Sequence, residues 1–169
     1  MASGFFPFLM TQLALGLFLA LESVFAERES HQKTQRVIFH FALSAFNTAV
    51  FELILGSTVL QALSWATAGN YGLLSYWKVG SFSQVVLSVL VLDFSGYWMH
   101  RWNHTVSFFW KFHQVHHQDR EVDATTSLRE HIGQRVVSFP LELLTLTVLG
   151  TTWPIYLGFK IASAILSFF

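Results

Sequence analysis

Residues 79–104 read VGSFSQVVLSVLVLDFSGYWMHRWNH, and this stretch joins an apolar run to a pair of histidines without a break. Between positions 79 and 99 the one charged residue is Asp93. A helix crosses the hydrocarbon core of a bilayer with roughly 17–25 mainly apolar residues, so the run is long enough to span a membrane. The stretch therefore predicts a transmembrane helix that leads directly into His100 and His104.

The whole chain has the composition of a membrane protein. Of its 169 residues, 53% are hydrophobic and 12% are charged, whereas a soluble domain carries about 25% charged residues. The hydrophobic residues gather in long runs without the alternation that is typical of strands. We therefore expect a single all-α membrane domain over residues 1–169, a polytopic helical bundle of four to five transmembrane helices. The predicted spans are residues 5–26, 37–63, 79–99, 136–152 and 153–169.

The first apolar run has two interpretations. One is a secretory signal peptide, because Val24-Phe25-Ala26 fits a cleavage site. The other, which we favour, is a retained membrane span, because no Lys or Arg precedes the run and it is long for a signal-peptide core. Between the last two spans, Trp153-Pro154 is expected to end one helix and begin the next.

The basic residues predict the orientation in the membrane, because cytoplasmic loops are rich in Lys and Arg. The loop after the first span holds three basic residues and the polar segment 100–135 holds five, whereas the loop between the second and third spans holds Lys78 alone. Both basic segments are therefore expected in the cytoplasm and the N-terminus on the other side. We expect a multi-pass integral protein of the endoplasmic reticulum or of a bacterial inner membrane, with a cytoplasmic histidine-rich segment.

Charge and residue types exclude several other classes of protein. Ten basic and ten acidic residues leave no net charge, so the chain lacks the positive surface that binds nucleic acid. The absence of cysteine excludes disulfides, thiolate zinc sites and iron–sulfur clusters. No phosphate-binding glycine loop or serine-nucleophile motif is present.

Five of the eight histidines lie between residues 100 and 117. They form the patterns H-x-x-x-H and H-x-x-H-H, and side chains three or four residues apart share one face of a helix. Imidazole is a good ligand for zinc, copper, iron and nickel, so we predict a metal site at the cytoplasmic end of the third span. The candidate ligands are His100, His104, His113, His116, His117 and His131. We interpret the remaining two, His31 and His40, as ordinary residues of the membrane interface.

Two residues of the third span are candidates for holding a ligand ring in place. Asp93 and Tyr97 lie on the same helical stripe as His100 and His104, at positions i, i+4, i+7 and i+11. An ionisable group inside a span is a functional candidate. A carboxylate or hydroxyl group there is able to orient a metal-bound imidazole by a hydrogen bond.

Three segments resemble motifs of the fatty acid hydroxylase / sterol desaturase superfamily. Residues 93–104, DFSGYWMHRWNH, are similar to its D-x-x-x-Y-x-x-H-R-x-x-H, and residues 110–117, WKFHQVHH, to its W-x-x-H-x-x-H-H. Residues 123–131, DATTSLREH, resemble its segment ending in R-x-H-P, with Ile132 here in place of the proline. The resemblance covers about residues 92–169, nearly half of the chain.

This resemblance implies an enzyme, a lipid-modifying oxygenase that hydroxylates or desaturates a fatty acyl or sterol-like substrate. It further implies a non-haem di-iron centre held by the six histidines, dioxygen as co-substrate and a cytochrome- or ferredoxin-type electron donor. The superfamily has another histidine cluster beyond the position where this chain ends. We therefore expect a C-terminally truncated chain that is inactive or severely impaired on its own.

Two alternatives remain open. In the first, the histidines bind zinc or a single iron and the chain has no oxygenase activity. In the second, the chain is a catalytically inactive membrane protein that interacts with a partner and has no dependence on metal.

Overall fold

The computed structural model describes Leu13 and residues 33–167, and all of the secondary structure in residues 33–167 is helical. The all-α prediction is therefore confirmed for this part of the chain. The predicted span 5–26, apart from Leu13, and His31 lie outside the described residues. The elements in chain order are α2 (Lys33–Ala68), α3 (Leu73–Tyr76), α4 (Ser81–Thr105), α5 (Ser107–His117), the 3-10 helix η1 (Ala124–Leu128), α6 (Ile132–Leu149) and α7 (Trp153–Leu166).

Three helical segments in this part of the chain are long and apolar enough to cross a membrane. They are Thr34–Tyr76, Ser81–Thr105 and Ile132–Leu149, and Trp153–Leu166 is a shorter apolar helix. Large hydrophobic side chains stay exposed on the outside, for example Leu53 at 86% and Phe82 at 83%. Soluble proteins rarely expose apolar surface on this scale, so the bundle has the surface of a membrane protein.

The helices extend beyond the predicted spans where polar residues continue them. Helix α2 covers Lys33–Ala68, whereas the predicted span is 37–63. Helix α4 continues past the predicted end at position 99 to Thr105 and so includes the first two histidines. Hydropathy marks the part of a helix that lies in lipid, while the backbone hydrogen bonds continue into the polar residues on either side.

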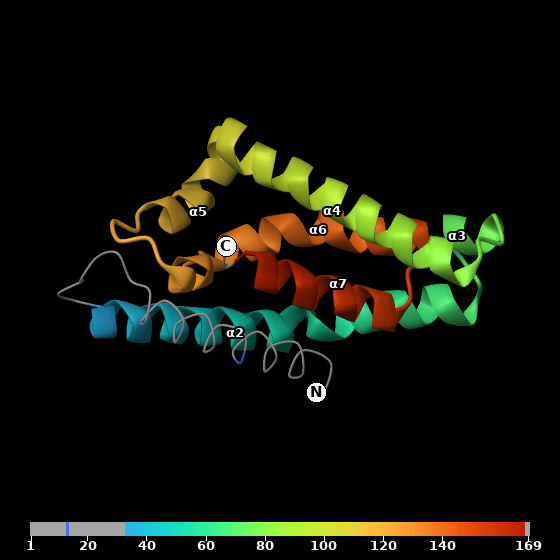
Figure 1. Ribbon diagram of the computed structural model, residues 1–169, viewed down its shortest axis with the longest axis horizontal. Helices are drawn as coiled ribbons and strands as arrows, with labels where there is room; N and C mark the ends of the chain where they lie inside the picture. The colour runs from blue at the N-terminus through green and yellow to red at the C-terminus, as the bar shows by residue number, and fades with distance from the viewer. Residues whose placement is uncertain (1–12, 14–32, 168–169) are drawn as a thin grey trace.

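The core lies where α2, α4, α6 and α7 meet. Figure 1 shows that α4 approaches α6 near α3 and diverges from it toward α5. Helix α5 folds back from the end of α4 and packs against both α4 and α6. The buried apolar side chains of the core are Val59, Leu63, Leu92, Phe139, Leu146 and Tyr156.

Two glycines allow the turns at the α3 end of the bundle to touch. Gly150 ends α6 with φ 72°, and Gly72, which precedes α3, has φ 102°. A Cβ atom on Gly150 would collide with the carbonyl oxygen of Tyr71, so this contact requires glycine. Helix α7 then begins at Trp153 with Pro154 in its first turn, which confirms the predicted helix boundary.

Candidate metal centre

The candidate ligands are brought together because α5 folds back along the end of α4. Val106 has an extended backbone, with φ −102° and ψ 116°, and it separates the two helices. His100 and His104 are one turn apart on α4, and His113 and His117 are one turn apart on α5. The two pairs therefore face each other, and the ring centroids of His100 and His113 are 4.9 Å apart.

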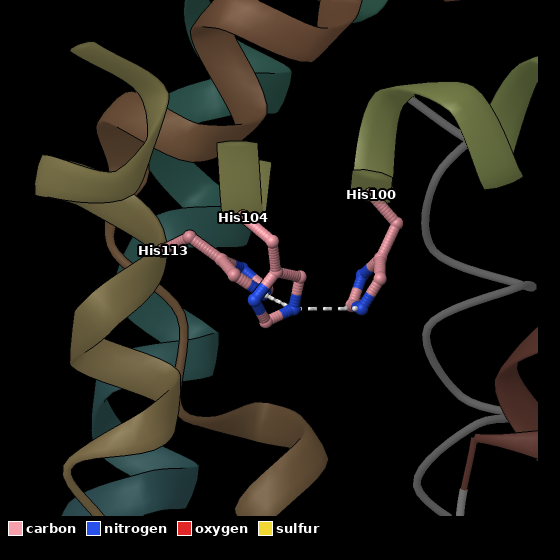
Figure 2. A group of neighbouring side chains, drawn as sticks. All are labelled: His100, His104 and His113. Carbon is pink, nitrogen blue, oxygen red and sulfur yellow. Dashed lines mark hydrogen bonds between the residues drawn. The ribbon is translucent and has the colours of Figure 1, made fainter. Parts of the chain in front are cut away.

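Four imidazole Nε2 atoms form a continuous series. The Nε2–Nε2 distance is 3.2 Å from His100 to His104, 3.2 Å from His104 to His113 and 3.1 Å from His113 to His117. Figure 2 shows the first three rings, with their nitrogen atoms turned toward one another. One nitrogen from each of these three residues lies within 4.8 Å of the other two.

This spacing lets each neighbouring pair of nitrogens share a metal ion. Two nitrogens that each bind one tetrahedral metal ion at about 2.0–2.1 Å lie about 3.3 Å apart. The Nε2 atoms here are 3.1–3.2 Å from their neighbours. Iron and zinc both accept imidazole nitrogen, so the donor set suits either metal.

Two groups outside the histidine patterns orient the rings. His113 Nδ1 donates a hydrogen bond to Gln134 Oε1 at 2.9 Å, and His116 Nδ1 donates one to the carbonyl oxygen of Thr126 at 3.1 Å. Each bond places the ring proton on Nδ1 and leaves Nε2 available for a metal. Gln134 could not be predicted from the sequence, because its contact with His113 depends on how α6 packs against α5 and no local spacing indicates it.

His131 is placed differently from the other predicted ligands. Its Nδ1 accepts a hydrogen bond from the backbone N–H of Gly133 at 2.9 Å, so it caps the start of α6. Its ring packs on Phe112, with 5.4 Å between the ring centroids. In the described part of the chain, no hydrogen bond or ring contact joins His131 to the other five histidines.

Asp93 and Tyr97 lie beside the histidines without a hydrogen bond to them. Both line a cavity that also includes His100. The hydroxyl oxygen of Tyr97 accepts a hydrogen bond from Arg101 Nη1 at 3.3 Å. The proposed role of Asp93 and Tyr97 in orienting a ligand ring stays a prediction.

The interpretation of His40 as an ordinary interface residue was wrong. Its side chain is fully buried, with Nδ1 2.9 Å from Thr125 Oγ1 and Nε2 3.7 Å from Asp119 Oδ2. Both partners lie in the segment between α5 and α6, about half a chain length away in sequence. Local hydropathy contains no information about a contact of this kind.

A buried charged cluster ties α2 to the same segment. Arg36 pairs with Asp119 at 3.3 Å and also with Asp123, and both carboxylates are almost completely buried. Thr126 Oγ1 donates a hydrogen bond to Asp119 Oδ2 at 2.7 Å. The carbonyl oxygen of Thr126 is the one that contacts His116, so the cluster holds the backbone that orients this histidine.

The surroundings of two α5 histidines, His113 and His117, favour the neutral form of their imidazoles. Burial lowers the pKa of His113 below the ordinary value of 6.5, the Gln134 hydrogen bond opposes this effect, and the imidazole of His104 reinforces it. Burial, followed by the neighbouring imidazoles of His113 and His116, lowers the pKa of His117. Since neutral imidazole is the form that binds metal, both residues are competent ligands at neutral pH.

Comparison with known proteins gives matches over this region. Residues 85–169, half of the chain, match the family model described as fatty acid hydroxylase. An alkylglycerol monooxygenase of Xenopus tropicalis is 40% identical over 53 residues, which are 31% of this chain and 12% of the relative. The Danio rerio protein of that name is 37% identical over 62 residues, which are 34% of this chain and 14% of the relative. The Homo sapiens protein is 32% identical over 73 residues, which are 43% of this chain and 16% of the relative.

The matched part of the chain covers only 12–16% of the length of these relatives. The family match begins within α4 and continues through α7, so it contains all six predicted metal ligands. No solved structure matches the chain.

Proposed function

Because the chain belongs to the fatty acid hydroxylase family, we propose that it carries the metal centre of a membrane oxygenase that hydroxylates a lipid. The observation that supports this most directly is the series of four Nε2 atoms at 3.1–3.2 Å spacing. Iron is the proposed metal, as two ions in the complete centre. The proposed ligands are His100, His104, His113, His116 and His117, together with His131, which caps α6 in this structure and would have to turn toward the other five to join the centre.

Iron bound by these histidines would supply the redox chemistry that activates dioxygen, with electrons from a cytochrome- or ferredoxin-type donor. The chain's own residues prepare the site for it. Gln134 and the Thr126 carbonyl hold the ring protons on Nδ1. The Trp110 ring lies 5.7 Å from the ring of His104 and 5.6 Å from that of His117, so it packs beside two of the proposed ligands.

The substrate is proposed to reach the histidines through the bundle. Tyr97, His100 and Asn103 line one cavity of about 620 Å³ that extends between α4, α6 and α7. Its walls are helices whose outer surfaces suit lipid, so a lipid dissolved in the bilayer is the natural ligand. We infer a multi-pass arrangement with the histidines on the cytoplasmic side, where a soluble or anchored electron donor has access.

A glycerol alkyl ether is the first substrate to test, because the relatives are named as alkylglycerol monooxygenases. We accordingly propose hydroxylation ahead of desaturation.

Metal content tests the proposal. The chain is purified in detergent, loaded with ferrous iron and analysed for metal by mass spectrometry. Its oxygen-dependent conversion of an alkylglycerol is then measured, with a chemical reductant as the source of electrons. We expect at least about one equivalent of iron, and its loss in the double variant His104→Ala/His113→Ala. Gln61→Ala, at an exposed position on α2, is the control. Less than one equivalent of iron or zinc, or equal metal content in the double variant and wild type, contradicts the proposal.

A zinc-binding protein without oxygenase activity is the second candidate function. It is favoured by the donor set, since neighbouring imidazole nitrogens at 3.1–3.2 Å suit zinc as well as iron. Preferential binding of zinc from a mixture of both metals, together with no oxygen-dependent product, would support this candidate over the oxygenase.

A further inference from the structure

One cavity connects the histidines with the middle of the bundle. Its volume of about 620 Å³ lies within the range of small-molecule binding sites. His100 and Asn103 line it, and so do Glu142 of α6 and Lys160 of α7. Asn103 Oδ1 is buried and has no hydrogen-bond partner in the described part of the chain. An unsatisfied buried acceptor is unfavourable, so a bound ligand that donates a hydrogen bond would stabilise it.

A charged pair lines the same cavity. Lys160 Nζ lies 2.9 Å from Glu142 Oε1, and the hydroxyl of Tyr156 donates a hydrogen bond to the same oxygen at 2.9 Å. The side chains of Lys160 and Glu142 are 46% and 27% exposed. The pair is therefore open to the cavity and accessible to a ligand.

Helix packing does not require this pair. Apolar side chains of similar volume hold helices together as well as a buried ion pair does, and charges within membrane segments generally mark functional sites. Phe139 and Leu146 already pack α6 into the core. An ammonium group has three donors, and among the described contacts of Lys160 one hydrogen bond is made, to Glu142. The pair thus retains hydrogen-bonding capacity.

The charges of the cavity argue against an anionic ligand. Its acidic residues outnumber its basic ones, so a carboxylate or phosphate head group is disfavoured. A cationic head group would compete with Lys160, which already contacts Glu142. A hydroxyl group both donates and accepts and so can bond to both members of the pair. The charged residues that line the cavity are Glu52, Asp93, Glu130, Glu142, Arg135 and Lys160.

Helix α6 sets the separation between the pair and the histidines. Gln134, which contacts His113, and Glu142 both lie on α6, eight positions apart (142 − 134). At a rise of about 1.5 Å per residue this is about 12 Å. A lipid held at the pair would extend along the cavity toward His100.

We propose that Lys160, Glu142 and Tyr156 form the head-group site of the lipid substrate, and that this head group is neutral and carries hydroxyl groups. Only the description of this lipid as a substrate rests on the proposed function. Binding itself requires no metal, so the two can be tested separately.

The test compares three lipids with the same saturated chain: an alkylglycerol, a fatty acid and an alkylamine. Their affinities for the full chain in detergent are measured by equilibrium dialysis with radiolabelled lipid. We expect the alkylglycerol to bind about tenfold more tightly than either of the others, or better. Lys160→Met/Glu142→Gln removes both charges at similar volume and is expected to weaken alkylglycerol binding about tenfold or more. Lys78→Met, at the exposed turn before α4, is the matched control.

Several outcomes overturn the head-group site. If the wild-type chain binds the fatty acid or the amine as tightly as the alkylglycerol, or more tightly, the head-group site is contradicted and no variant is needed. The head-group site is also contradicted if the double variant keeps the wild-type affinity for alkylglycerol, or if the wild type shows no saturable binding. His104→Ala is expected to keep the lipid preference, because it changes only the metal centre. A chain with this preference and no bound metal would support the head-group site and refute the oxygenase.

Discussion

The amide of Gln134 holds the ring of His113 in the tautomer that the proposed metal site requires. Gln134→Leu removes the acceptor that lies 2.9 Å from His113 Nδ1. Loss of such an outer hydrogen bond typically weakens metal binding roughly 10–100-fold, and we expect an effect of this size on iron affinity. Gln134→Glu keeps an acceptor and should keep the affinity. Competition with a chelator measures both values.

Gln84→Leu makes the same substitution near the start of α4, where the side chain bonds only to the Val79 carbonyl oxygen. It should bind iron like the wild type. If Gln134→Leu does so as well, the amide has no part in orienting His113.

The pKa values of His113 and His117 predict the pH dependence of metal binding. Both lie below the ordinary 6.5, so these imidazoles remain neutral as the pH falls to that value, and protons compete with metal only in more acidic solution. Folded protein binds fewer protons than unfolded protein in this range, so metal-free protein should lose stability as the pH falls below 6.5.

Dialysis at a series of pH values followed by metal analysis checks this prediction. Bound iron should be equal at about pH 7.5 and about pH 6.5, and should decline at lower pH. Half-release above pH 6.5 would show that the histidines are protonated more readily than their burial implies.

At the scale of elements, the guanidinium of Arg36 is the main charged contact between α2 and the segment after α5. Arg36→Met leaves the buried carboxylates of Asp119 and Asp123 without their cationic partner. Removal of one member of a buried ion pair typically costs about 3–5 kcal/mol, and we expect a loss of that order in the free energy of unfolding. The segment that orients His116 should then loosen, so metal affinity should fall too.

Unfolding in mixed micelles with increasing denaturing detergent measures the change. Arg120→Met provides the control, because Arg120 is adjacent to Asp119 in sequence but exposed, and its effect should stay within about 0.5 kcal/mol. Equal stability of the two variants would mean that the buried cluster does not hold these elements together.

At the scale of the whole molecule, the features that could be predicted from the sequence are those that depend on local spacing. The all-α class follows from the length of the apolar runs. The convergence of His100 with His104 follows from the helical repeat, and their distance agrees with it. Their approach to α5 required only a short connection at Val106.

Contacts between distant segments could not be predicted in this way. Gln134 meets His113 across 21 positions and His40 meets Thr125 across 85. The pairing of Lys160 with Glu142 requires that α6 and α7 lie side by side. These contacts depend on which helix faces pack together, and many arrangements of apolar helices satisfy the same hydropathy.

The uninterrupted course of α4 from its apolar run into the histidines has a consequence for the bilayer itself. His100 comes 19 positions after Ser81 (100 − 81), which is about 29 Å of helix, close to the roughly 30 Å thickness of the hydrocarbon core. Hydrophobic mismatch would therefore act directly on the metal centre. In a thin membrane α4 can tilt and keep its histidines at the boundary, whereas a thick one would draw them toward the lipid, at fractions of a kcal/mol per Å. Membrane thickness would thus control the polarity around the proposed ligands.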